Sequence, residues 1–317
     1  MLVDFIGNNE ALNELERNVK NDDISHAYLF IGNEGVGKFT AAKELARRIL
    51  CEGNDSTYCS MVDEFYHPDL NIIRSGGENI KRAQIDELIV DSFKKPFAGK
   101  YKVFIIDGFE YVTTSGQNAL LKTLEEPGDY LKIILISNNI KKVLPTILSR
   151  TRIIKFTNVS RREIEKFLLE EKKAGVENSK LFARISGGSV NKALSYSGDP
   201  EFLALRNESI FLLDRLLNKV ISSPFKEYSF FSDNKENIDE IFNVFLLFLR
   251  DIIMLKLGLG EENIINIDKM ALLKKQSVDV NQAIKISEMI INTMKRLERN
   301  TNFQLTIEEL LINIGGV

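Results

Sequence analysis

A glycine-rich turn between an apolar run and a helical pattern is the feature that most constrains this chain. Residues 32–38 (GNEGVGK) follow the apolar residues 27–31 and precede a helical pattern at 41–46. A strand, a tight turn and a helix in that order point backbone N–H groups and the helix dipole at a phosphate, and Lys38 supplies a counter-charge. The sequence therefore predicts a phosphate-binding loop at the end of a strand.

Short apolar runs alternate with helical patterns over the first half of the chain. They indicate strands at residues 28–31, 70–73, 103–106, 133–136 and 153–156. Strands this short, separated by helices, predict an α/β fold with a parallel sheet that is covered on both faces. Functional residues of such folds gather at the carboxyl ends of the strands, where Gly32, Asp107 and Asn138 fall.

The rest of the chain reads as helical. Ser160 and Glu163 form a capping-box pattern that opens a helix running to Lys172. Residues 242–249 are apolar on most sides, which indicates burial in a helical bundle and against other subunits. Further helices are expected at residues 178–186, from 189 onward, and at 201–222, 237–257, 281–299 and 306–314. We therefore predict an α/β domain at residues 1–158, a small helical unit at 159–198 and an all-helical domain at 199–317.

Composition excludes some classes of function. The formal net charge of −3 argues against tight DNA binding by this chain alone, because phosphate neutralisation is the main source of such affinity. Charged residues interrupt the longest apolar stretch, 242–257, so no membrane span is predicted. The N-terminal residues lack a secretory signal pattern, and we expect a cytoplasmic protein. Two cysteines, Cys51 and Cys59, do not make a disulfide scaffold.

The nucleotide signatures are incomplete. Phe39 follows Lys38 at the position where a hydroxyl normally holds Mg²⁺, and Thr40 comes one residue late. Asp107 ends a predicted strand, but Gly108 follows it where an ATPase needs a carboxylate that activates water. Asp107 is either a Mg²⁺ ligand or a polar cap of the strand, and we favour the cap. The candidate nucleotide-binding residues are Gly32, Gly35, Gly37, Lys38, Thr40 and Asp107.

Two segments carry a family resemblance. Residues 117–127 (QNALLKTLEEP) and 144–150 (LPTILSR) resemble subunits of the bacterial clamp loader, which belongs to the AAA+ ATPases. Shorter matches at 26–30, 67–69 and 302–311 extend the resemblance over the whole chain. It implies an AAA+ domain, a helical lid and a helical collar that forms oligomers. It also implies other loader subunits as partners and, through the assembly, the sliding clamp and primed DNA.

In such loaders, ATP binds at subunit interfaces, and an arginine from the neighbouring subunit completes each site. The resemblance assigns this trans role to Arg150, although Thr151 follows it where the family usually has Cys. The alternative is an ordinary surface arginine. Asn191 stands where the lid normally offers a sensor arginine, so three features of the chain's own site are missing. We therefore expect no catalysis by its own site, while the loop either binds nucleotide weakly or is a retained turn.

A metal site often found in this family is also incomplete. The family carries four cysteines, the last three spaced C-x-x-C-x-x-C, but Val62 and Phe65 follow Cys59 at those spacings. Structural zinc normally needs four N or S ligands. We predict no zinc and expect Val62 and Phe65 to pack as apolar residues in its place, with His67 in a structural role.

Two other functions remain as alternatives. One is an ATP-hydrolysing motor subunit of the same loader, against which Phe39, Gly108 and Asn191 argue. The other is a binding module that acts in DNA repair, which failure to assemble with loader partners would favour.

Overall fold

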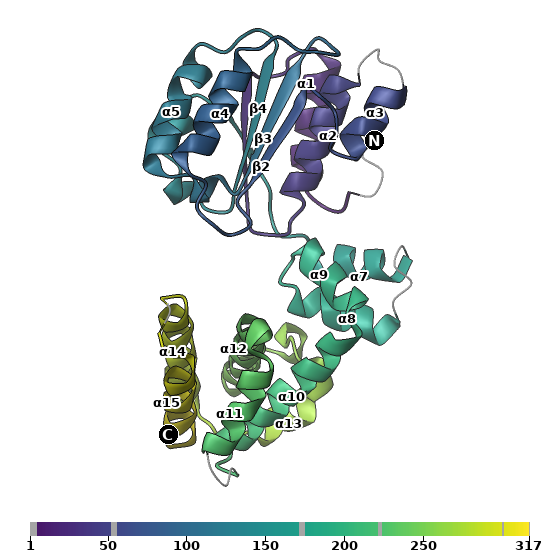
Figure 1. Cartoon of the computed structure of the whole chain (residues 1–317). Helices are drawn as coiled ribbons and strands as arrows, with labels where there is room; N and C mark the ends of the chain where they lie inside the picture. The colour runs from purple at the N-terminus through teal and green to yellow at the C-terminus, as the bar shows by residue number, and fades with distance from the viewer. Residues whose placement is uncertain (1–4, 52–55, 171–174, 221–223, 300, 317) are drawn as a thin grey trace. The chain divides into compact units, whose positions relative to one another are not determined.

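The computed structural model describes residues 5–51, 56–170, 175–220, 224–299 and 301–316 (Figure 1). Backbone contacts divide the chain into two compact units. The N-terminal unit contains Met1–Phe167 and Gly188–Lys192, and the C-terminal unit contains Leu168–Gly187 and Ala193–Val317. The boundary therefore runs through the predicted helical unit at 159–198, and the division into three domains stays a prediction.

A five-stranded parallel sheet organises the N-terminal unit, which confirms the predicted α/β class. Its strand order is β2-β3-β4-β1-β5, so β1 lies between β4 and β5. All five predicted strands are present, each within two residues of its expected start and end. They are β1 (Ala27–Ile31), β2 (Leu70–Arg74), β3 (Lys102–Asp107), β4 (Leu131–Ser137) and β5 (Arg152–Lys155).

Helices cover both faces of this sheet (Figure 1). Alternate residues of β1 enter different cores, since Tyr28 and Phe30 pack with α1 and α2, whereas Leu29 packs with α4 and α5. These alternating side chains explain why the strands are apolar throughout. The helices are α1 (Asn9–Lys20), α2 (Lys38–Leu50), α3 (Ser56–Asp63), α4 (Arg82–Ser92), α5 (Thr114–Glu125) and α6 (Pro145–Leu148), with short 3₁₀ turns η1 (Phe109–Tyr111) and η2 (Ile140–Lys142).

The segment after the sheet begins with the predicted capping box. The Glu163 N–H donates to Ser160 Oγ, and the Ser160 N–H donates to Glu163 Oε2, both at 3.3 Å. This box opens α7 (Arg161–Glu170). The predicted end of the helix at Lys172 lies outside the described residues. α8 (Val176–Ile185) and α9 (Val190–Gly198) follow, near the positions expected for them.

The described residues of the C-terminal unit contain helices and no strand. Their core surrounds α12, from which Phe242, Phe245 and Phe248 are fully buried. The predicted helix 201–222 is wrong at its end, because α10 stops at Leu217. Asn218 donates its side-chain N–H back to Asp214 O at 2.8 Å, and Lys219 has φ +56°. The helices are α10 (Pro200–Leu217), α11 (Pro224–Asp233), α12 (Ile238–Lys256), α13 (Met270–Lys275), α14 (Val280–Leu297) and α15 (Phe303–Gly316), with 3₁₀ turns η3 (Lys235–Asn237), η4 (Glu261–Asn263) and η5 (Ile267–Lys269).

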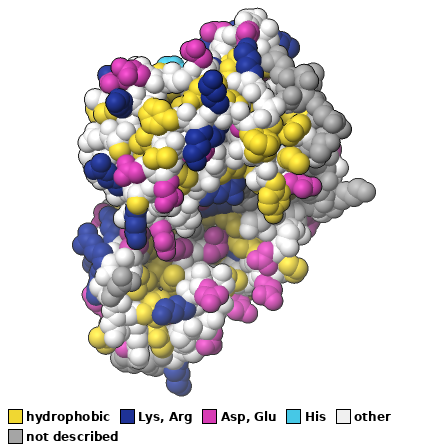
Figure 2. Space-filling view, turned by 45° about the horizontal axis from the view of Figure 1, so that its top comes forward, with side chains coloured by type: hydrophobic (Ala, Val, Ile, Leu, Met, Phe, Trp, Pro, Cys, Tyr) yellow, Lys and Arg dark blue, Asp and Glu magenta, His cyan; other side chains and the backbone are white. Residues whose placement is uncertain are grey.

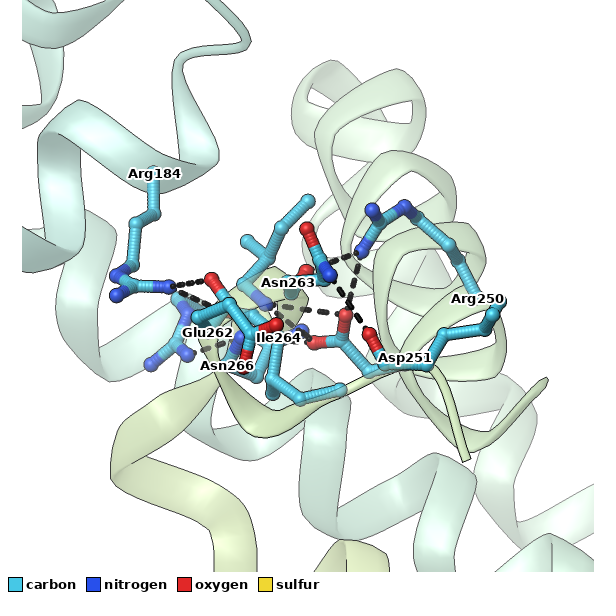
Figure 3. Close-up of polar contacts among 10 residues, drawn as sticks. Arg184, Arg250, Asp251, Glu262, Asn263, Ile264 and Asn266 are labelled. Carbon is cyan, nitrogen blue, oxygen red and sulfur yellow. Dashed lines mark hydrogen bonds and ion pairs between the residues drawn. The ribbon is translucent and has the colours of Figure 1, made fainter. Parts of the chain in front are cut away.

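A buried carboxylate organises the long connection between α12 and α13 (Figure 3). Asp251 is fully buried and accepts hydrogen bonds from the Ile265 and Asn266 backbone N–H groups, the latter at 2.7 Å. Arg184 of α8 donates to the Ile264 carbonyl of the same connection. Arg250 donates to Asp251 at 2.8 Å. The connection is therefore fixed by side chains from more than one helix of this unit.

Within the described residues, no helix is long and apolar enough to cross a membrane.

Candidate functional site: a phosphate-binding loop and a surface arginine

The predicted loop joins β1 to α2, as expected from the sequence. Gly35 and Gly37 have φ values of +75° and +93°, which residues with a Cβ rarely adopt. A Cβ on Gly32 would lie 2.3 Å from the Phe156 carbonyl oxygen, so the backbone there passes too close for any side chain. The three glycines thus fit the loop geometry, and α2 begins at Lys38.

Lys38 is held by the protein itself. Its Nζ donates to the Gly32 carbonyl at 2.7 Å, to Asn138 Oδ1 at 2.8 Å and to the Asn33 carbonyl. An ammonium group has three N–H donors, so every donor of Lys38 already has an acceptor. Burial lowers the pKa of Lys38, and the negative charges of Glu110 and Asp107 oppose this effect. A phosphate would have to displace protein acceptors to reach this side chain.

An arginine lies beside Asp107, where a phosphate-binding-loop ATPase holds Mg²⁺. In such enzymes the metal sits between the hydroxyl after the loop lysine and the aspartate that ends a neighbouring strand. Here the Arg74 guanidinium lies 3.6 Å from the ring centroid of Phe39, and its Nε lies 3.9 Å from Asp107 Oδ2. Burial raises the pKa of Asp107, while Arg74 and Lys38 oppose the rise. The Arg74 guanidinium therefore lies beside the carboxylate that would hold the metal in such an enzyme.

One cleft of about 420 Å³ in the N-terminal unit is lined by Lys38, Phe39, Arg74 and Asp107. Thr40 is exposed on it, and Gly108 lies on its wall. Asn191 also lines the cleft, and its backbone N–H donates to the Gly35 carbonyl at 3.2 Å. The structure therefore brings together Gly35, Gly37, Lys38, Thr40, Asp107, Asn138 and Asn191, whereas Gly32 does not line the cleft.

Two charged residues of this region, Arg74 and Glu110, are not among those predicted from the sequence. Arg74 is paired in register with Asp107 across β2 and β3, so both side chains emerge at the same edge of the sheet. Its position one residue past the predicted strand 70–73 was the signal that could have found it. Glu110 is buried, and its Oε2 accepts the Asn138 N–H at 3.1 Å. No local pattern singles it out.

Arg150 lies outside that cleft, between α6 and β5. Its Nη1 donates to the Thr146 carbonyl and to Ser149 Oγ, each at 3.0 Å. Its Nη2 lies 2.6 Å from Glu125 Oε1, and about a third of the side chain is exposed. Arg150 is thus a partly exposed cation that does not line that cleft.

The segment of the incomplete metal motif gives a mixed result. Val62 is fully buried, as predicted. The prediction for Phe65 is met only in part, because 43% of it is exposed. α3 ends at Asp63, and Phe65 takes φ +63°, which places its ring 6.0 Å from Phe39 and under the Lys43 ammonium. Among the described residues, no group of three or more His, Cys, Asp or Glu side chains could hold a metal ion.

The thiols of Cys51 and Cys59 are partly buried, and His67 is buried. Burial raises the pKa of Cys51 to about 12, and its contact with Cys59 adds to the rise. His67 is buried, and its Nδ1 accepts the Asp69 N–H at 3.1 Å. That contact fits the structural role expected for His67.

Charged side chains of both signs are mixed on the surface. On the face drawn in Figure 2, Lys and Arg lie among Asp and Glu rather than forming one basic stripe. This mixture agrees with the small net charge of −3.

Comparison with known proteins identifies the family. A family model described as "DNA polymerase III, delta subunit" matches residues 7–160, and another described as "DNA polymerase III, delta subunit, C terminal" matches residues 200–315. The chain is 28% identical over 309 residues to the DNA polymerase III subunit delta' of Bacillus subtilis, covering 94% of this chain and 93% of that protein.

Another relative and one solved structure are also similar to this chain. DNA polymerase III subunit tau of Escherichia coli is 32% identical over 204 residues, which cover 61% of this chain and 32% of that protein. A DNA polymerase III gamma subunit-related protein from Thermotoga maritima has the same fold, with a TM-score of 0.51 at 20% identity over 96% of this chain and 99% of that one. Because both family models match in order and a delta-prime relative spans nearly the whole chain, this protein belongs to the delta-prime family of DNA polymerase III clamp-loader subunits.

Proposed function

We propose that this subunit supplies Arg150 to the ATP site of a neighbouring loader subunit and hydrolyses no ATP itself. Membership of the family implies association with the other loader subunits. Through that assembly, in the cytoplasm, the chain would help to place the sliding clamp on primed DNA. The predicted division into AAA+ domain (1–158), lid (159–198) and collar (199–317) belongs to the same proposal.

The position of Arg150 carries this proposal. The guanidinium is partly exposed and lies outside the chain's own cleft. An arginine stays charged and can engage two oxygens of a phosphate. In ATPases and GTPases, an arginine supplied in trans stabilises the charge of the transition state and raises the rate on the order of 10³–10⁵-fold.

The contacts inside the chain's own cleft support the proposal that this subunit hydrolyses no ATP itself. All three donors of Lys38 have protein acceptors, and Arg74 lies beside Asp107. Phe39 and Gly108 offer neither a metal-binding hydroxyl nor a carboxylate. Turnover of ATP by the isolated subunit would contradict this part and would favour the motor alternative.

The test is the ATPase rate of a reconstituted loader stimulated by clamp and primed DNA. Arg150→Ala is expected to lower the rate at the site that Arg150 completes on the order of 10³-fold, with assembly intact by size-exclusion chromatography. Arg162→Ala is the matched control, because Arg162 is exposed on α7. Equal turnover by native and Arg150→Ala loaders would exclude the trans role.

A further inference from the structure

Glu125 holds one side of the Arg150 guanidinium. It is the last residue of α5, and its Oε1 lies 2.6 Å from Arg150 Nη2. On the other side, the Thr146 carbonyl and Ser149 Oγ each accept from Nη1 at 3.0 Å. These contacts hold the Arg150 guanidinium between the end of α5 and the short helix α6.

These contacts leave part of the guanidinium free. An arginine has five N–H donors, and the hydrogen bonds above come from Nη1, while Nη2 meets Glu125 as an ion pair. Among the described residues, neither the Nε–H nor Nη2 donates a hydrogen bond. Donors on Nε and Nη2 thus remain for phosphate oxygens.

The elements on both sides of Arg150 are tied together. Leu120 and Leu124 bury α5 against the sheet. Gln117 of the same helix donates to the Lys142 carbonyl at 2.9 Å and accepts the Leu144 N–H at 2.9 Å, just before α6. These bonds join α5 to the segment that leads into α6. Glu125 therefore contacts Arg150 from a helix that is itself held in place.

We propose that Glu125 is a positioning residue, which holds Arg150 in the orientation that reaches the neighbouring ATP. This inference rests on the proposed function of Arg150. A long arginine side chain has many rotamers, so fixing it before the partner's phosphate arrives lowers the entropy lost in the transition state. Glu125 itself touches no reacting group and acts only through Arg150.

The opposite role would be a latch that keeps Arg150 away from the partner. About half of the Glu125 side chain is exposed, and exposed ion pairs are weak. An ion pair this weak is outcompeted by a triphosphate for the arginine. It is still strong enough to favour one rotamer of the Arg150 side chain. The donors that remain on Nε and Nη2 also favour positioning over masking.

The experiment compares Glu125→Gln, Arg150→Ala and the double variant in the reconstituted loader, at varied ATP concentration. Glu125→Gln keeps the shape of the side chain and removes its charge. At the site that Arg150 completes, it is expected to lower kcat about two- to fivefold, the range that an exposed ion pair supports, with KM for ATP and assembly unchanged. The double variant should match Arg150→Ala alone, because Glu125 acts through Arg150.

Two further variants make the test specific. Glu126→Gln is the matched control, since Glu126 is the adjacent exposed carboxylate and shows no side-chain partner among the described residues. It should leave kcat unchanged. Glu125→Asp retains the charge on a shorter side chain and should recover part of the lost rate. Thermal unfolding of each variant checks that the fold is kept.

The outcomes separate the two proposals. If Arg150→Ala lowers turnover but Glu125→Gln leaves kcat unchanged or raises it, the positioning role is wrong and the trans arginine stands. The same holds if Glu125→Gln lowers kcat further in the Arg150→Ala background. If Arg150→Ala itself has no effect, the proposed function fails, and the role of Glu125 fails with it.

Discussion

Lys38 shows how one residue type can serve structure where its motif suggests ligand binding. Its ammonium is buried and bridges two carbonyls of its own loop to Asn138, one hundred residues along the chain. In an active ATP site, the lysine N–H groups would donate to phosphate oxygens instead. Here they join the loop to the end of β4, so the lysine acts as a cross-link within the N-terminal unit.

Replacing this lysine should cost stability rather than loader activity. Lys38→Met keeps an unbranched side chain and leaves three acceptors without a donor. We expect the free energy of unfolding to fall by about 1–3 kcal/mol, the cost of leaving buried polar groups unpaired. Chemical denaturation of the isolated subunit measures this loss.

The control for that variant is Lys122→Met, because Lys122 is exposed on α5. Its stability should stay unchanged. Loader turnover with Lys38→Met should equal that of the native chain wherever the subunit remains folded. A large loss of turnover at normal stability would show that the loop takes part in catalysis.

At the scale of elements, polar side chains hold the connection between α12 and α13 in place. Asp251 accepts from two successive backbone N–H groups and from the side chain of Asn266 at 2.9 Å. Arg206 of α10 holds the far end through Asp268, at 2.8 Å and 2.9 Å. A buried carboxylate that meets this many donors recovers the cost of its desolvation.

Removing the charge of Asp251 should loosen this connection. Asp251→Asn replaces one acceptor by an amide N–H that faces other donors in the buried site. We expect a loss of about 3 kcal/mol in the free energy of unfolding. Asp239→Asn on the exposed surface of α12 is the control and should change stability little. Equal stability of both variants in urea would show that the network contributes nothing.

At the scale of the whole molecule, each compact unit contains a carboxylate whose pKa is lowered. Burial would raise the pKa of Asp91, but the Lys102 and Lys94 ammonium groups lower it by more. Burial likewise opposes the lowering of the Asp268 pKa, which Arg206 causes. Lys102 Nζ lies 2.7 Å from Asp91, and Arg206 Nη2 lies 2.8 Å from Asp268.

Acid should therefore weaken both units. A carboxylate whose folded pKa lies below its unfolded value, about 3.9, stabilises the fold above that value. This stability is lost as the pH falls through the folded pKa, so the loss is expected below about pH 4. Calorimetry between pH 7 and pH 3 should show lower transition temperatures for both units.

The variant Asp268→Asn ties that loss to a named pair. It should lower stability at pH 7 and reduce the further loss in acid, because the neutral amide has no proton to gain. Asp239→Asn should behave as the native chain does. Transition temperatures that stay constant down to pH 3 would contradict the assignment.

The sequence by itself determined what depends on neighbouring residues. Apolar runs of four or five residues fixed the five strands, since such runs between helices suit a sheet buried on both faces. The glycine spacing indicated the loop, and Ser160 with Glu163 indicated the start of α7. These features follow from backbone preferences that act over a few residues.

Only the tertiary structure decided which distant side chains meet. Arg74 reaches Asp107 because β2 pairs with β3 in one register, and Lys38 reaches Asn138 because β4 lies beside β1. Glu125 meets Arg150 because α5 packs against α6. The outward turn of Phe65 likewise follows from a single backbone conformation after α3. Such contacts depend on strand order and packing, which local periodicity does not encode.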